Sequence, residues 1–322
     1  MVNIPADETT AARLVHHCGM RRRVRNVATV SAIVVVALLV AGCAAPPSGD
    51  TRYVDQVFAS TTSHLDLPYA TAPALITGST VTLSGDVYEP AGDTLVSRPA
   101  IVWVHGGGFA AGSRSSVAGV AAAYARRGYV TLNVSYRLDP GNRCQDVQHD
   151  RISDPTELAA ERARCMAAIR AAQHDTQAAV RWLRANAATY GVDVSRIAVG
   201  GFSAGAITAV NLAQRADDPG VVGDHLDQPS TVAAALSASG CNYETEWIDG
   251  ADAPISLLAS EHDDAVLFSC TLATEQVAEA VGTPVQTLYH LGEGTHALDL
   301  YAKYRVATDA AWTSFLVEHL SL

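Results

Sequence analysis

Ser203 lies at the centre of the motif GFSAG at residues 201–205, which fits the pattern G-x-S-x-G. Residues 197–200 before it read as an apolar strand, and residues 204–215 read as a helix. Glycines two positions either side of a serine let a strand turn sharply into a helix and expose the hydroxyl at the helix N-terminus. The helix dipole and free N–H groups there favour developing negative charge. The motif therefore predicts that Ser203 is a nucleophile, since the alternative of a surface glycine turn leaves the flanking strand and helix unexplained.

A second glycine-rich motif, HGGGF at residues 105–109, directly follows the apolar run at 100–104. Its glycines let backbone N–H groups approach a substrate carbonyl oxygen without interference from side chains. We expect the N–H groups of Gly107, Gly108 and Ala204 to form an oxyanion hole, in which one donor typically contributes about 2.7–4 kcal/mol. The alternative, a phosphate-binding loop, is disfavoured because neither a Walker Lys-Ser/Thr pair nor GxGxxG spacing follows. His105 is expected to brace the loop rather than to transfer protons.

The two motifs together, about 95 residues apart, resemble those of α/β-hydrolase esterases of the hormone-sensitive-lipase and bacterial carboxylesterase kind. The resemblance covers residues 69–320 and implies the α/β-hydrolase fold, a serine nucleophile and no cofactor. One position departs from the hormone-sensitive-lipase group, which usually has Asp before the serine where this chain has Phe202. The departure bears on the subgroup, not on the nucleophile.

In this fold the acid and the base follow the serine in the order acid, then histidine. The acid is expected after the apolar run at 254–260, and Asp263 stands there three residues before Val266, which resembles the family pattern Gly-x-x-Asp-x-x-Val. Asp264, otherwise a helix cap, and Glu261 are the alternative acids.

The base is expected on a loop after the last strand. His296 ends the segment at 291–296 and resembles the Gly-x-His of the family; His290, at the strand end, is the alternative. His296 would take the proton of Ser203 while Asp263 orients the imidazole. An acyl-enzyme would form and then be hydrolysed by water.

Hydrolysis of a small-molecule acyl ester is the favoured reaction, because HGGG-type loops accompany esterases and lipases. A serine peptidase or amidase on the same fold is one alternative, although most peptidases of this fold carry a large accessory domain. A non-catalytic binding module is the other. Four aromatic residues either line an acyl pocket or pack in the core: Phe109, Phe202, Tyr243 and Trp247.

Strands and helices alternate along the body of the chain, which predicts right-handed crossovers and a mostly parallel sheet with helices on both faces. The expected class is α/β, with one catalytic domain at 63–322. Residues 139–173 interrupt the alternation and are expected to run over the active-site edge as a small lid insertion. After a leading hairpin at 69–78 and 81–89, we expect strands at 100–104, 129–136, 197–200, 231–237, 254–260 and 284–290, and helices at 117–127, 174–190, 204–215, 268–281 and 302–319.

The first 42 residues read as a signal segment. An arginine cluster precedes an apolar run of about 14 residues, too short for a bilayer span but suited to a signal-peptide core. The sequence LVAGC ending at Cys43 resembles a bacterial lipobox, so we expect lipidation of Cys43, a tether at 43–62 and a protein anchored to the cell membrane outside the cytoplasm. Met20 as the true start is part of this hypothesis. The alternative is an uncleaved anchor helix.

The chain of 322 residues has a net charge of −11, which argues against nucleic acid as a partner. No CxxC or Cys/His cluster has zinc-ligand spacing, so no metal site is expected. The four cysteines of the body suggest two disulfides in an exported protein, with pairing by proximity preferred and reduced thiols as the alternative. The preferred pairs are Cys144–Cys165 and Cys241–Cys270.

Overall fold

The computed structural model describes residues 51–215 and 218–322, which form one compact unit. The predicted signal segment, Met20 and Cys43 lie outside these residues. Within the predicted tether, the N–H groups of Tyr53 and Phe58 donate to the carbonyls of Arg127 and Arg126, so this part lies against the domain. In the described part of the chain, no helix is long and apolar enough to cross a membrane.

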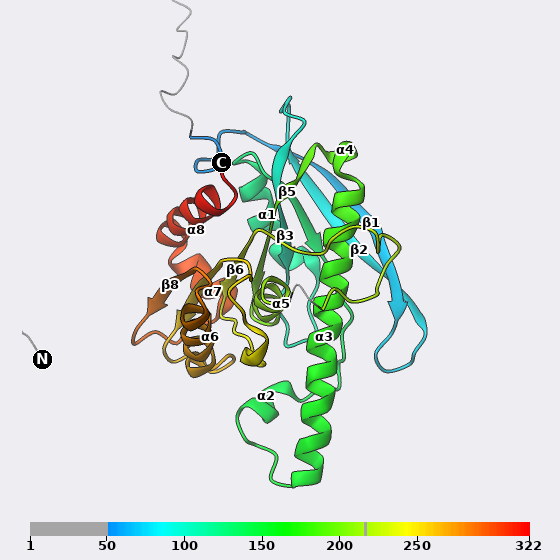
Figure 1. Ribbon diagram of the computed structural model, residues 1–322, viewed down its shortest axis with the longest axis vertical. Helices are drawn as coiled ribbons and strands as arrows, with labels where there is room; N and C mark the ends of the chain where they lie inside the picture. Colours follow the sequence, from blue (N-terminus) through cyan, green and yellow to red (C-terminus); the bar gives the residue numbers. More distant parts are fainter. Residues whose placement is uncertain (1–50, 216–217) are drawn as a thin grey trace, which may run out of the picture. The chain divides into compact units, whose positions relative to one another are not determined.

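An eight-stranded sheet forms the centre of the unit (Figure 1), with the strand order β1-β2-β4-β3-β5-β6-β7-β8. The strands β1 and β2 form an antiparallel hairpin and β2 is antiparallel to β4, whereas the rest of the sheet is parallel. All residues of β3, β4, β6 and β7 are buried, as expected for continuous apolar runs. The strands are β1 Thr61–Pro73, β2 Thr80–Pro90, β3 Arg98–Val104, β4 Val130–Val134, β5 Val192–Phe202, β6 Ala234–Ala238, β7 Ile255–Ser260 and β8 Val285–His290.

Helices cover both faces of this sheet, because alternate residues of the buried strands point to opposite sides. Val102 and Val104 of β3 pack in the cluster that includes α3 and α5, while Ile101 and Trp103 pack in the cluster that includes α1, α7 and α8. The predicted mostly parallel α/β architecture is confirmed. The helices are α1 Ala118–Ala125, α2 Cys144–Gln148, α3 Pro155–Ala185, α4 Ala187–Tyr190, α5 Ala204–Ala213, α6 Phe268–Val281, α7 Ala297–Lys303 and α8 Arg305–His319.

The predicted helix at 174–190 was wrong in extent, because α3 starts at Pro155 and is 31 residues long. Its first turns are largely exposed and carry few large apolar residues before Cys165, so the periodicity predicted only the more buried second half. The signal that marks the true start is the helix N-terminal capping residue: the Asp154 carboxylate accepts the N–H of Glu157, and proline occupies the first helical turn.

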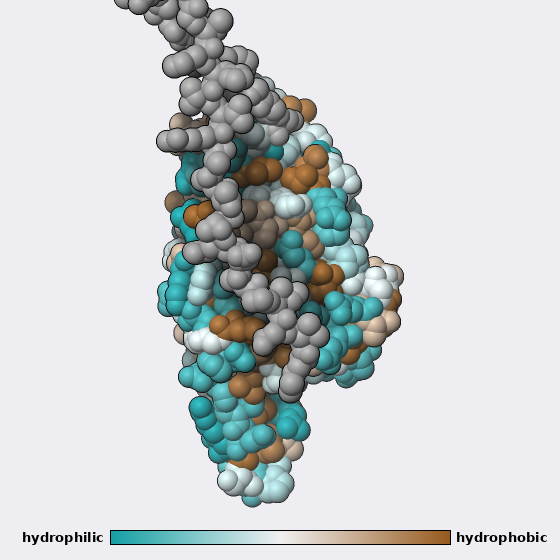
Figure 2. Space-filling model, turned by 90° about the vertical axis from the view of Figure 1, so that its left-hand side faces the viewer, coloured by the Kyte–Doolittle hydropathy of each residue, from teal (hydrophilic) through white to brown (hydrophobic). Residues whose placement is uncertain are grey.

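Residues 139–173, which we call the cap, therefore consist of a turn, α2 and the first half of α3. Figure 1 shows them extending beyond the sheet, and Figure 2 shows a mostly hydrophilic surface at this lower end of the unit. The predicted helix at 302–319 corresponds to α8, and the structure adds a separate short helix, α7, which begins directly after His296.

Two disulfides join Cys144 to Cys165 and Cys241 to Cys270, which confirms the predicted pairing. The first connects α2 to α3 within the cap. The second connects the loop after β6 to α6. The cap and the loop after β6 both lie at the carboxyl edge of the sheet, and the two disulfides restrict their movement.

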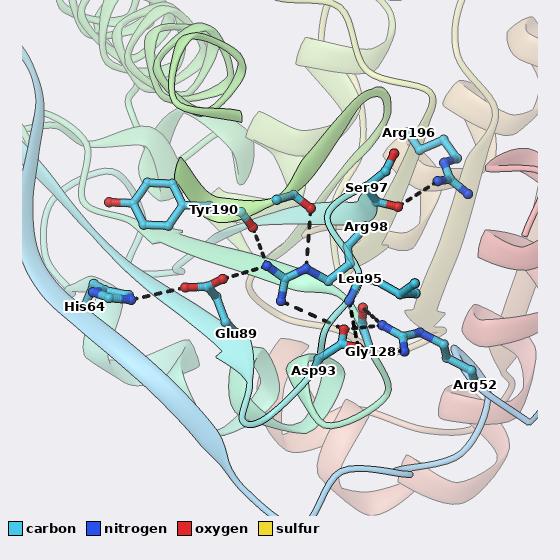
Figure 3. A network of polar contacts seen from close by, with 11 residues as sticks. Arg52, His64, Glu89, Asp93, Leu95, Ser97, Arg98, Gly128, Tyr190 and Arg196 are labelled. Carbon is cyan, nitrogen blue, oxygen red and sulfur yellow. Dashed lines mark hydrogen bonds and ion pairs between the residues drawn. The ribbon is translucent and has the colours of Figure 1, made fainter. Parts of the chain in front are cut away.

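Arg98 lies at the amino end of β3, the end of the parallel strands opposite to the carboxyl edge (Figure 3). Its guanidinium group donates to the Glu89 carboxylate at 2.7 Å and to the carbonyls of Tyr190 and Gly191 at 2.5 and 3.4 Å. The nearby Asp93 carboxylate is paired with Arg52, so the first described residues are joined to the same network. Arg98 is only 5% exposed, and its partners have little access to water.

Arg98→Met should lower the free energy of unfolding by about 3 kcal/mol, because it leaves buried carboxylate and carbonyl oxygens without a partner. Arg196→Met is the matched control: Arg196 lies beside the same loop but is more exposed, and its loss should cost less than about 1 kcal/mol. Urea unfolding followed by circular dichroism measures both. Equal losses would contradict a special role for Arg98.

Candidate active site

The predicted site residues lie on four loops at the carboxyl ends of parallel strands. Ser203 stands between β5 and α5, the glycine motif follows β3, Asp263 follows β7, and His296 lies between β8 and α7. Carboxyl ends of parallel strands share one edge of a sheet, which is where α/β folds place their ligands. The structure brings all four elements together at this edge.

Ser203, His296 and Asp263 form a hydrogen-bonded series. The Nε2 atom of His296 lies 2.8 Å from Oγ of Ser203, and its Nδ1 atom lies 2.7 Å from Oδ2 of Asp263. With Nδ1–H donating to the carboxylate, Nε2 is free to accept the serine proton. This is the arrangement in which a histidine acts as a general base on a hydroxyl.

The backbone at Ser203 has a φ of 55° and a ψ of −122°, a conformation that L-residues rarely adopt. Two glycines permit this turn. A Cβ atom on Gly205 would lie 2.2 Å from the carbonyl oxygen of Val104, and one on Gly201 would lie 2.1 Å from the carbonyl oxygen of Gly205. The motif therefore serves close backbone contact, and the N–H of Ser203 is held by the carbonyl of Ala238 at 2.9 Å.

Asp263 is buried, and its Oδ1 atom accepts the N–H groups of Ala265 and Val266 at 2.8 and 3.0 Å. Burial by itself raises the pKa of Asp263, but the hydrogen bonds from His296 and Val266 outweigh it, so that the pKa lies below its ordinary value. The carboxylate therefore stays ionised at neutral pH and stabilises a charged imidazole.

The alternative acids and base lie elsewhere. Asp264 is exposed, and the Glu261 carboxylate accepts the N–H of Gly292. His290 stacks on Tyr304, with ring centroids 3.6 Å apart.

Ser239, which no motif identifies, also supports the site. It follows β6 with a φ of 56°, its hydroxyl accepts the N–H of Ala297 at 2.9 Å, and it hydrogen-bonds the Asp263 carboxylate. It thus connects the acid loop with the residue that follows His296.

The glycine loop is held by its own carbonyl groups. The carbonyl of Gly106 accepts Nδ1–H of His105 at 2.7 Å, and the carbonyl of Gly107 accepts two N–H groups, those of Ala110 and Ala111. In a trans peptide the N–H points away from the carbonyl, so these bonds turn the N–H groups of Gly107 and Gly108 in the opposite direction. Gly107, Gly108 and Ala204 line the same pocket as Ser203, as an oxyanion hole requires.

His105 is fully buried and stacks on Tyr136 at 4.4 Å. Burial lowers the pKa of His105 below its ordinary value, so the ring is neutral at pH 7. Its position fits the expected bracing of the loop.

A pocket of about 1210 Å³ surrounds Ser203, large for a small-molecule site. Of the four aromatic candidates, Phe109, Phe202 and Tyr243 line it and Trp247 does not. The Phe202 ring packs in the core against Trp103, and Trp247 lies under the Arg215 guanidinium, away from the pocket. No group of three or more His, Cys, Asp or Glu residues suited to a metal occurs within the described ranges.

The cap forms one wall of this pocket and is tied to the opposite side. The hydroxyl of Tyr243 donates to Oε1 of Gln148 at 2.7 Å, and Nε2 of His149 donates to the carbonyl of Asp264 at 2.9 Å. Sequence reasoning placed the cap at this edge but identified none of its lining residues, since they carry no motif. Among them are Asn142, Arg143, Arg162, Met166 and Ile169.

Asp263→Asn should flatten the acid dependence of stability. Because the pKa of Asp263 is lower in the folded chain than in the unfolded one, its charge contributes stability that is present above about pH 4 and lost as the pH falls through the folded pKa. The free energy of unfolding should therefore fall less steeply below about pH 4 in the variant than in the wild type, measured by urea unfolding at stepped pH. Asp264→Asn, at an exposed neighbour, should keep the wild-type slope, and an unchanged slope in Asp263→Asn would contradict the prediction.

Comparison with protein-family models finds a match to the family BD-FAE at residues 85–151 and 161–241. The two segments contain both glycine motifs, and the break between them falls at the start of α3.

Curated proteins similar to this chain include Carboxylesterase 1C of Rattus norvegicus, 32% identical over 173 residues, and Carboxylesterase NlhH of Mycobacterium tuberculosis, 33% identical over 161 residues. Each alignment covers 49% of this chain, but only 28% and 40% of the respective relative. The chain thus matches less than half the length of these relatives.

Among solved structures, a truncated carbohydrate esterase from gut microbiota covers 83% of this chain with a TM-score of 0.57 at 17% identity, and 99% of that structure is matched. The propionate-bound esterase Est2 of Thermogutta terrifontis covers 78% with a TM-score of 0.59 at 21% identity, and 94% of it is matched. These likenesses confirm the expected α/β-hydrolase fold.

Proposed function

This chain has the α/β-hydrolase fold and is related to carboxylesterases, and we propose that it is a serine carboxylesterase with Ser203 as nucleophile. The observation that carries the proposal is the hydrogen-bonded series from Ser203 through His296 to Asp263, at 2.8 and 2.7 Å, at the base of a large pocket. The glycine loop on the other side of Ser203 supplies the donors that such a nucleophile needs.

In the proposed reaction, His296 takes the proton of Ser203 as its oxygen attacks the acyl carbonyl. The N–H groups of Gly107, Gly108 and Ala204 bind the resulting oxyanion, and Asp263 stabilises the imidazolium. His296 then gives its proton to the leaving alcohol. Water, deprotonated by His296, attacks the acyl-enzyme and releases the acid and the free serine.

The pocket supports an ester with a sizeable apolar part. Phe109 and Leu267 contribute apolar wall, as do Met166 and Ile169 of the cap, whereas Arg143 and Asp146 of the cap add polar groups. Est2 of Thermogutta terrifontis binds propionate and butyrate, and it is phosphorylated by paraoxon and phosphoramylated by tabun. This chemistry supports an acyl-ester substrate and an organophosphate-reactive nucleophile here.

Ser203→Ala should abolish both labelling by a fluorophosphonate probe and turnover of p-nitrophenyl butyrate, with kcat/KM falling by at least about 10⁴-fold. Ser116→Ala is the matched control, because Ser116 lines the same pocket but its hydroxyl donates to the Ser113 carbonyl. It should keep labelling and turnover. If Ser203→Ala is still labelled, as Ser116→Ala is, the assignment of Ser203 is wrong. A wild type without turnover would overturn the proposed esterase activity itself.

We also propose that the protein is exported and held at the cell membrane by lipid on Cys43, facing outside the cytoplasm. The arginine cluster, the short apolar run and the lipobox-like sequence support this, and two disulfides in the domain favour an oxidising compartment. With part of the predicted tether lying against the domain, the free linker would be shorter than 43–62.

Cys43→Ser should move the protein from the membrane to the soluble fraction and prevent incorporation of radiolabelled palmitate, with esterase activity unchanged. Cys18→Ser should leave both unchanged, since Cys18 lies before the proposed start. Cell fractionation and autoradiography measure the outcome. A wild-type protein that takes up no label would contradict lipidation.

A further inference from the structure

The turn at the start of the cap is hydrogen-bonded to the glycine loop. The N–H of Asp139 donates to the carbonyl of Phe109 at 2.8 Å, and the Nδ2 amide of Asn142 donates to the carbonyl of Gly108 at 3.0 Å. Two consecutive carbonyls of the proposed oxyanion loop are therefore held by the cap and not by the sheet.

The glycine loop needs such partners because its backbone is strained. Gly107, Gly108 and Phe109 have consecutive positive φ values of 122°, 62° and 60°. Glycine tolerates this region, but a phenylalanine there is unfavourable and persists only where its surroundings impose it. The peptide between Gly108 and Phe109 is the one whose carbonyl Asn142 holds, so its orientation depends on that amide.

The turn is itself rigidly attached to the cap. Arg164 of α3 makes two hydrogen bonds of 2.6 Å to the Asp139 carboxylate and holds the pKa of that group below its usual range. The Oδ1 atom of Asn142 accepts the N–H of Cys144 at 3.1 Å, and Cys144 is bonded to Cys165 of α3. Asn142 thus accepts from α2, while its amide donates both to the glycine loop and, at 2.9 Å, to the carbonyl of Asp139 within the same turn.

We propose that Asn142 is a positioning residue: by holding the carbonyl of the Gly108–Phe109 peptide, it restrains the loop directly after the N–H groups of Gly107 and Gly108 and so keeps these two donors in place for the oxyanion. The proposal rests on the esterase function proposed above. It makes the cap a determinant of the chemical step as well as a wall of the pocket. Asn142 acts through the backbone, so its loss should change transition-state stabilisation more than substrate binding.

Asn142→Asp in the full-length protein tests this. It keeps the shape of the side chain and the acceptor for Cys144, but loses the amide that donates to the carbonyls of Gly108 and Asp139. With p-nitrophenyl butyrate we expect kcat to fall about tenfold with KM within about twofold, a smaller loss than the roughly 100-fold or more for removing an oxyanion donor. Asn186→Asp is the matched control, because Asn186 donates the same amide to the Trp182 carbonyl at the end of α3, outside the pocket; it should leave kcat and KM unchanged.

A trifluoromethyl ketone gives the second readout, since addition of Ser203 to its carbonyl creates an oxyanion in the same place. Its Ki should rise in Asn142→Asp by the factor by which kcat/KM falls. Arg164→Gln loosens the turn from α3 with Asn142 intact, and should lower kcat in the same direction by less. If Asn142→Asp shows no cooperative thermal unfolding, the kcat of Arg164→Gln tests the inference in its place.

The inference is overturned if Asn142→Asp keeps the wild-type kcat, or if only its KM rises, which a purely pocket-shaping role would give. It is also overturned if Arg164→Gln retains full activity where Asn142→Asp does not fold. These results leave the esterase proposal standing, because the wild type still turns over ester. A wild type without turnover overturns both.

Discussion

The site depends on one close approach of backbone to backbone. The turn that carries Ser203 passes so near the end of β3 that position 205 has no room for a side chain beyond hydrogen. This contact places the serine beside the loop that leaves β3, and the parallel register of β5 with β6 and of β7 with β8 then brings the acid and base loops to the same edge. The positions of the three residues in the hydrogen-bonded series follow from the backbone of the sheet and its loops.

The buried parts of this fold were predictable because burial leaves a pattern. Continuous apolar runs marked the central strands, and the spacing of glycines marked the two loops at the serine. The first half of α3 was missed because its first turns are exposed and carry few large apolar residues, although Asp154 and Pro155 mark its start. Ser239 and Asn142 were missed for a different reason: each acts through contacts 24 or more positions away in the chain, and nothing in the local sequence encodes them.

The cap and the catalytic loops are one connected structure. Two side-chain hydrogen bonds across the pocket and the turn at Asp139 join the cap to the loops after β3, β6 and β7, and a disulfide joins α2 to α3 within the cap. The pocket wall is consequently not an independent flap laid over a finished site. The strained glycine loop owes part of its conformation to residues that a description of the triad alone would leave out.

The length of α3 has a consequence for how the pocket wall is held. Its second half packs in the core, with Val180 and Leu183 fully buried, while its first turns are largely exposed and one side of them, around Arg162 and Met166, lines the pocket. Because both halves belong to one continuous rod, the core half fixes the direction of the outer half. A side chain on the exposed pocket side of this outer part, such as Arg162, therefore reaches the cavity from a backbone that the core half holds in place.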